Sequence, residues 1–307
     1  MNSDFREAPQ GATRLADWGV IRAHGEDARS FLHGQLTQDL IHLDDSSARL
    51  AGYCSPKGRL LASFVLWQRG PAEVLLACSA DLLAPTLKRL SMFVLRAKCR
   101  LSDASSELPL FGLAGAAARA ALGAESPAVA WGRVRRGEAD LLRLPDAAGV
   151  ARWIWAGPGL PAMPALAPED WAWLEVRSGI ARIVAATADR FVPQMVNLEL
   201  VGGVNFQKGC YPGQEVVARS QYRGTLKRRA FLFESEAEAA PGQDLFAASD
   251  PEQPAGLVAG AARSSGGRWS VLAEAKLALA AEILHVGSAD GPALAAAALP
   301  YALPAEA

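Results

Sequence analysis

The sequence contains few cysteines, and their spacing is irregular. Only 4 of the 307 residues are cysteine, and no two of them form a Cys-x-x-Cys pair. This pattern excludes a disulfide framework and disfavours a zinc site or an iron-sulfur cluster held stably by this protein alone. We therefore expect a reducing compartment and predict no metal ligands. Cys54, Cys78 and Cys99 are interpreted as small buried packing residues, as most free cysteines are.

Long apolar runs are also absent. No stretch approaches the roughly 20 apolar residues that cross a bilayer. The first residues, MNSDFREAPQ, carry acids early and have no apolar centre, so they do not resemble a signal peptide. The sequence predicts a soluble, cytoplasmic protein with no membrane partner.

Neither sign of charge dominates. Lysine and arginine total 31 against 32 acids, a net charge of -1, so any nucleic-acid contact must come from a local patch. The densest basic cluster is Arg219, Arg223, Lys227, Arg228 and Arg229. It has two interpretations: a solvated strand entry, or a docking site for a polyglutamate tail or a phosphate backbone such as tRNA. No dinucleotide, nucleotide or zinc-protease motif is present.

Short strand-like and helical patterns alternate along the chain. This mixture predicts an α+β fold better than a doubly wound parallel sheet. Proline-rich residues 157–170 are the clearest linker, and strand-like runs near the end predict a small β-barrel or sandwich. Helices are predicted at 25–40, 81–95 and 171–183. Strands are predicted at 18–23, 73–79, 96–102, 108–115, 128–134, 139–145, 151–157, 257–263, 268–274 and 282–286, with a hairpin across 51–67.

The most unusual stretch is KGCYPGQE, residues 208–215. Residues 204–206 alternate like a short strand and Glu215 opens a helical pattern, with Pro212 suited to its first position, so Cys210 is predicted just before helix amides. The positive helix end and Lys208 would both favour the thiolate. Cys210 is thus predicted to be functional, although a histidine partner cannot be identified from spacing.

KGCYPGQE resembles the signature K-G-C-Y-x-G-Q-E of the YgfZ family, and all seven specified positions match. That family consists of folate-binding relatives of the T-protein, the aminomethyltransferase of the glycine cleavage system. The resemblance implies an accessory protein that binds tetrahydrofolate or a one-carbon derivative. It would support iron-sulfur client enzymes, including tRNA-modifying ones. It also implies a multidomain GcvT-like fold with two interleaved α/β subdomains over 1–226 and a C-terminal β-barrel over 227–307.

Three further elements support the resemblance: FLHGQLTQD at 31–39, SPKGR at 55–59 and EVRSG at 175–179. It implies that Glu175 contacts the pterin, since a carboxylate can accept two hydrogen bonds from the pterin edge. Lys57 and Arg59 would face an anionic folate carboxylate. The remaining site residues implied are Cys210 and Lys208 for chemistry, with Tyr211, Gln214 and Glu215 beside the cofactor.

Less specific interpretations stay open for these residues. Glu175 suits a surface Glu-Arg pair, charges beside a hairpin usually face solvent, and Gln35, Thr37 and Asp39 suit the solvated face of a helix.

One departure from the T-protein pattern bears on catalysis. Where aminomethyltransferases carry an aspartate pair, this chain has Leu60-Leu61-Ala62-Ser63. Enzymatic activity is therefore left open. The alternatives are a folate-dependent one-carbon transferase that uses another acid, and a non-catalytic adaptor that docks RNA or a client.

Overall fold

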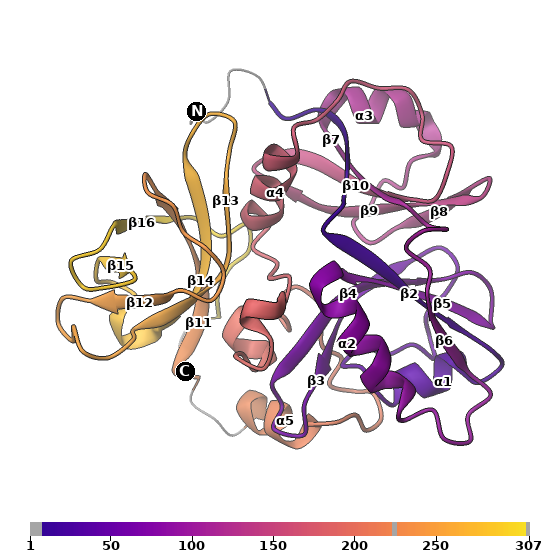
Figure 1. Ribbon diagram of the computed structural model, residues 1–307, viewed down its shortest axis with the longest axis horizontal. Coiled ribbons are helices and arrows are strands. Elements are labelled where there is room, and N and C mark those ends of the chain that lie inside the picture. The colour runs from indigo at the N-terminus through magenta and orange to yellow at the C-terminus, as the bar shows by residue number, and fades with distance from the viewer. Residues whose placement is uncertain (1–7, 223–225, 305–307) are drawn as a thin grey trace.

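A computed structural model describes residues 8–222 and 226–304. Two five-stranded antiparallel sheets are followed by a closed six-stranded barrel (Figure 1). The mixed architecture with a small C-terminal barrel confirms the predicted fold class. Arg223, one member of the basic cluster, lies outside the described residues. In the part of the chain described, no helix is long and apolar enough to cross a membrane.

The first sheet has the strand order β3-β4-β5-β2-β6. The predicted hairpin is confirmed, because β3 and β4 pair directly on either side of the Ser55–Arg59 turn. Nearly every β4 residue is buried, which suits its apolar sequence. The strands are β2 (Trp18–His24), β3 (Ala48–Cys54), β4 (Leu60–Gln68), β5 (Glu73–Ser79) and β6 (Arg100–Asp103), and the helices beside them are α1 (Ala28–His33) and α2 (Ala80–Ser91).

The second sheet has the order β1-β7-β10-β9-β8. Its edge strand β1 is separated from β2 of the first sheet by only residues 15–17, so the chain passes between the sheets near its start. The strands are β1 (Gly11–Arg14), β7 (Leu110–Ala114), β8 (Arg133–Arg136), β9 (Ala139–Ala147) and β10 (Val150–Ala156), and the helix α3 (Gly115–Leu122) packs on them.

Helix α4 (Pro168–Arg177) follows the linker and joins the second sheet to the barrel (Figure 1). Its residues contact β1 and β9 on one side and β13 and β14 on the other. Trp171 packs so tightly on Gly112 of β7 that a Cβ there would lie 2.4 Å from the indole. The contact between Trp171 and Gly112 therefore fixes the position of α4 on the second sheet.

The barrel closes in the order β11-β14-β13-β12-β15-β16 around its own apolar core. The predicted strands at 257–263, 268–274 and 282–286 are confirmed. A further strand, β16, lies in the alanine-rich tail where no element was predicted. The strands are β11 (Arg228–Ser235), β12 (Asp244–Ala247), β13 (Gly256–Arg263), β14 (Trp269–Lys276), β15 (Leu284–Val286) and β16 (Ala293–Ala297).

Several predicted helix ends are wrong. The helix expected over 25–40 ends at His33, α2 ends at Ser91 and α4 at Arg177. The first is short because Thr37 donates its hydroxyl to Gly203 O at 2.6 Å, which holds the backbone in another path. Thr37 is fully buried, so its assignment to a solvated face is wrong.

The segment before Cys210 is also irregular. Residues 204–206 form no strand, and Asn205 N instead donates to Thr37 O. Helix α5 (Gln214–Tyr222) begins two residues after Pro212, so the prediction of proline at the first helical position is wrong. Cys210 nevertheless precedes a helix, as predicted.

Candidate functional site: the Glu175 pocket and the Cys210 loop

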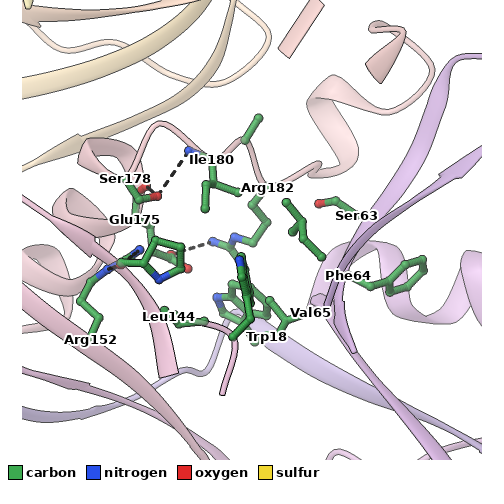
Figure 2. A pocket seen from close by; sticks show the side chains of 14 residues that line it. Trp18, Ser63, Phe64, Val65, Leu144, Arg152, Glu175, Ser178, Ile180 and Arg182 are labelled. Atoms are coloured by element: carbon green, nitrogen blue, oxygen red, sulfur yellow. Dashed lines mark hydrogen bonds and ion pairs between the residues drawn. The ribbon is translucent and has the colours of Figure 1, made fainter. Parts of the chain in front are cut away.

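Glu175 lies in a pocket where the two sheets and α4 meet (Figure 2). The hollow measures about 470 Å³ with its open mouth included. Its walls are mainly apolar and aromatic, and few polar groups reach into it. Besides Glu175 the lining consists of Trp18, Leu50, Ser63, Phe64, Val65, Trp131, Leu144, Pro145, Arg152, Ser178, Ile180, Ala181 and Arg182. Such a composition suits a small planar ligand oriented by a few polar contacts.

The carboxylate of Glu175 faces two arginines. Arg182 lies 3.6 Å away, and its guanidinium also stacks 4.8 Å from the ring centre of Trp18. Figure 2 shows the Glu175–Arg182 pair as a dashed line across the pocket. Burial raises the pKa of the Glu175 carboxyl, and the charge of Arg182 is the largest influence opposing that rise. The surface-pair interpretation of Glu175 is wrong, because its side chain is only 17% exposed.

Arg152 enters the pocket from β10 and is almost fully buried. Its guanidinium donates to Pro145 O at 3.1 and 3.2 Å and lies over the Trp171 ring. Burial lowers its pKa to about 10, so it stays protonated at neutral pH. Arg182 also forms an ion pair with Asp17, so its charge is divided between two carboxylates, and Arg152 is the lining arginine better placed to meet an anionic ligand.

Glu175 is the single carboxylate among the pocket's described lining residues. At the place where the aspartate pair would stand, Ser63 lines the pocket instead, and its hydroxyl accepts a hydrogen bond from Ile183 N at 2.9 Å. This part of the hairpin therefore places a hydroxyl group, not a carboxylate, on the pocket wall.

Cys210 lies on an exposed loop, residues 207–213, which we call the Cys210 loop. Its neighbour Lys208 is buried and points inward: Nζ donates to His33 O, at the last residue of α1, and to Leu36 O, three residues further on, at 2.9 Å. The ammonium also lies 4.8 Å from the centre of the buried Tyr211 ring. Burial lowers the pKa of Lys208 to about 8. Lys208 thus anchors the loop while the thiol stays outside.

The loop packs against the hairpin turn after β3. Gly213 has φ +79°, and a Cβ there would lie 2.4 Å from Ser55 O. Gly58 has φ +72°, and a Cβ there would lie 2.8 Å from Val216 Cβ. Only glycine fits both the backbone conformation and this close approach.

The segment after α1 holds the other side of the loop. Gln38 Nε2 donates to Gly202 O at 2.7 Å, next to the Thr37 contact with Gly203. His33 lies at the end of α1, and its Nε2 would be 3.6 Å from a Cβ on Gly209. Its Nδ1 lies 3.2 Å from Asp39 Oδ1. The three elements 31–39, 55–59 and 208–215 thus meet at one place.

The site residues implied by the resemblance therefore fall into two groups. Glu175 lines the pocket, whereas the other residues are absent from its lining: Lys57, Arg59, Lys208, Cys210, Tyr211, Gln214 and Glu215. Lys57 is exposed, Arg59 bonds Arg190 O, and Glu215 forms a surface pair with Arg219 at 2.7 Å. Trp18, Arg152 and Arg182 were not identified from the sequence. An arginine within a strand or beyond a helix gives no local signal of a shared pocket.

The basic cluster is largely used inside the protein. Arg229 is buried and pairs with Glu199, and Arg228 pairs with Glu274 at 2.8 Å. Arg229 is therefore poorly placed for the predicted RNA contact, because its guanidinium is buried and paired within the protein. Arg219 and Lys227 remain exposed. Within residues 8–222 and 226–304, no three histidine, cysteine or acidic side chains are grouped to hold a metal.

Comparison with known proteins gives consistent results. The chain is 37% identical over 250 residues to the tRNA-modifying protein YgfZ of Edwardsiella ictaluri, covering 76% of this chain and 73% of the relative. The Escherichia coli O157:H7 protein of the same name is 31% identical over 244 residues, covering 75% and 74%. The fold resembles the glycine cleavage system aminomethyltransferase T of Bartonella henselae, with TM-score 0.76, 16% identity and coverage of 96% and 86%. No family model matches.

Proposed function

The chain belongs to the YgfZ family, and from that premise we propose that it binds a tetrahydrofolate in the Glu175 pocket and supports iron-sulfur enzymes, including tRNA-modifying ones, through Cys210. The relatives' name places them in tRNA modification, and the similar solved structure is an aminomethyltransferase. The proposal assigns the pocket to folate and the loop to the client.

The observation that carries the folate part is the position of Glu175. Its carboxylate is largely buried in an aromatic pocket, where two hydrogen bonds to the N–H groups of a pterin edge would be strong. Arg152 provides positive charge that a folate glutamate would meet, whereas Arg182 is paired with Asp17 and Glu175. When bound, the folate would supply one-carbon chemistry; the protein's own residues orient it and shield it from water.

The lining supports an accessory role over a transferase. Glu175 is the only carboxylate on the described pocket wall and is paired with Arg182 at 3.6 Å, so the wall offers no second acid to share proton transfer with it. The proposal therefore gives Glu175 a binding role.

The Cys210 part rests on exposure and anchoring. The thiol is exposed while Lys208 and Tyr211 beside it are buried, so the loop holds a nucleophile in a fixed position outside the protein. An exposed thiol can reach a partner, whereas the buried Cys54 and Cys78 cannot. We assign Lys57, Gln214 and Glu215 to the surface around the Cys210 loop. Arg59 and Tyr211 would hold the loop in position.

The test of the folate part is a calorimetric titration with 5-formyl-tetrahydrofolate of wild type, Glu175→Gln and Glu169→Gln. Glu169 is exposed in the first turn of the same helix and is the matched control. Loss of charge-assisted hydrogen bonds should weaken binding about 10-fold to 100-fold in Glu175→Gln and leave Glu169→Gln unchanged. Equal affinity in all three would contradict the assignment of the pocket.

The test of the thiol part is complementation of a strain that lacks the protein, with Cys210→Ala and the control Cys99→Ala. The readout is the level of a tRNA modification made by an iron-sulfur enzyme. Cys210→Ala should fold, bind folate and fail to restore the modification. Full restoration would show that the thiol is dispensable.

A further inference from the structure

The connection from α2 to β6, residues 92–99, exposes large apolar side chains. Leu95 is 84% exposed, Met92 59% and Phe93 46%. Five other large hydrophobic residues are comparably exposed, but none has two such neighbours within three positions along the described chain. Clustered exposed apolar residues mark interaction sites in soluble proteins.

Positive charge surrounds this connection. Lys88, Arg96 and Arg100 are exposed, and no ion pair engages them among the residues that the structure describes. Only Lys98 is neutralised locally, by Glu26. Methionine, aromatic residues and arginine are the residue types enriched at protein interfaces, and free positive charge is complementary to an acidic partner.

Hydrogen bonds near its C-terminal end hold the α2–β6 connection in a defined position. Lys98 N donates to Asp27 Oδ2 at 2.7 Å, and Asp27 N donates to Lys98 O at 3.2 Å. Val94 packs inward against the main core while its neighbours face outward. The apolar side chains are therefore presented by a fixed backbone, which lowers the entropy lost on binding.

Helix α1 links this patch to Cys210. Asp27 at its start holds the α2–β6 connection, and His33 at its end contacts the Cys210 loop through Lys208. Six helical residues span about 9 Å. Figure 1 places α1, α5 and the end of α2 at the same lower end of the molecule. An interface of about 800 Å² per partner is roughly 30 Å across, so one protein can cover both features.

We propose that the α2–β6 connection is the docking surface for the client enzyme on which Cys210 acts, a protein that presents an apolar patch bordered by acidic side chains. This inference rests on the proposed function. Aliphatic Met92 and Leu95 favour a protein partner over RNA, because nucleic acids are bound through phosphate charge and aromatic stacking.

The experiment compares neutral substitutions in the complementation assay above. Leu95→Ser together with Met92→Ser removes apolar contact, and Arg96→Ser removes charge. Ile283→Ser and Arg263→Ser are matched controls on the barrel side, where Ile283 is 64% exposed. Since interface residues that matter contribute more than about 1 kcal/mol, each patch variant should lower the tRNA modification roughly fivefold or more. Both controls should behave as wild type.

Two further measurements make the outcomes decisive. Binding of 5-formyl-tetrahydrofolate should be unchanged in every variant, which separates docking from the pocket. Purified bulk tRNA is the second probe: if Arg96→Ser alone reduced tRNA binding and function while the Met92/Leu95 variant kept both, the surface would be an RNA site and the proposal overturned. Patch variants that restore modification fully would also overturn it. Failure of wild type to restore modification would instead refute the proposed function.

Discussion

Gly58 and Gly213 lie against each other where the hairpin turn meets the Cys210 loop: a Cβ on Gly213 would lie 2.6 Å from Gly58 Cα. Both residues have positive φ, so each resists substitution for two separate reasons. The position of the thiol thus depends on a glycine contact three residues away.

Gly213→Ala should destabilise the protein by about 2–3 kcal/mol, because backbone strain adds to the clash with Ser55 O. Gly202 has φ +81°, and a Cβ there would have no neighbouring atom within 4 Å. Gly202→Ala therefore tests backbone strain alone and should lower the stability by only about 1 kcal/mol. Gly209→Ala, with ordinary φ, should be close to neutral. Urea denaturation of the three variants measures the differences, and equal losses at Gly213 and Gly202 would remove the packing part of the explanation.

Lys208→Met should lower stability by about 1–3 kcal/mol, since His33 O and Leu36 O lose their donor. Lys227→Met is the exposed control. Burial lowers the folded pKa of Lys208 to about 8, below its ordinary 10.5, so the unfolded chain binds more protons between these values. Wild-type stability relative to Lys208→Met should therefore rise from pH 8 to 10. A pH-independent difference in chemical denaturation would argue against the lowered pKa.

Folate binding should weaken on acidification at a higher pH than an ordinary glutamate would give, because burial raises the pKa of Glu175 and the ionised form binds the pterin. Arg182→Gln removes the main opposing charge and should move the midpoint to higher pH still. Fluorescence titrations between pH 4 and 8 would be compared with Glu175→Gln, whose profile should lack this transition. Coincident profiles for wild type and Arg182→Gln would contradict the pairing.

One thiol should react rapidly with a disulfide reagent in the native protein. Cys210 is exposed, Cys99 half-buried and Cys54 and Cys78 buried. Burial raises the pKa of Cys54 and of Cys78 to about 12, which further suppresses their thiolates. Stopped-flow labelling should lose its fast phase in Cys210→Ala and keep it in Cys99→Ala. A fast phase that survives in Cys210→Ala would place reactivity elsewhere.

Arg229→Ala should be strongly destabilising, by about 3–5 kcal/mol, since it leaves Glu199 buried without its partner. Arg219→Ala should change stability by less than about 0.5 kcal/mol, because its pair with Glu215 is exposed. Thermal unfolding of the two variants makes the comparison. Similar small losses would mean that Glu199 finds another partner.

Much of the fold could be predicted from local sequence patterns. The β3–β4 hairpin and most strands were recognisable from apolar runs and turn residues, and the barrel from evenly spaced short strands. Helix ends were less predictable, because Thr37 and Gln38 bond to backbone some 165 residues away. No pattern near 25–40 contains that information.

The site was predictable only in parts. KGCYPGQE located an exposed cysteine before a helix, as expected from its glycines and polar residues. In the pocket, Glu175 was identified only through the family resemblance and Trp18 and Arg152 were not identified, since these residues come from α4, β2 and β10 and meet only through the packing of two sheets. The direction of Lys208 was also unpredictable: its charge is held by Leu36 O within the protein.

Because the chain passes directly from β1 to β2, the strands of the two sheets become able to pair at different stages of synthesis. All strands of the first sheet have been made once residue 103 has emerged, whereas β1 must wait for its neighbour β7, at residues 110–114. Until β7 has emerged, β1 has no partner strand, although β2 is already paired. A ribosome-bound chain of intermediate length would therefore expose β1 as a free edge, the kind of segment that holding chaperones bind.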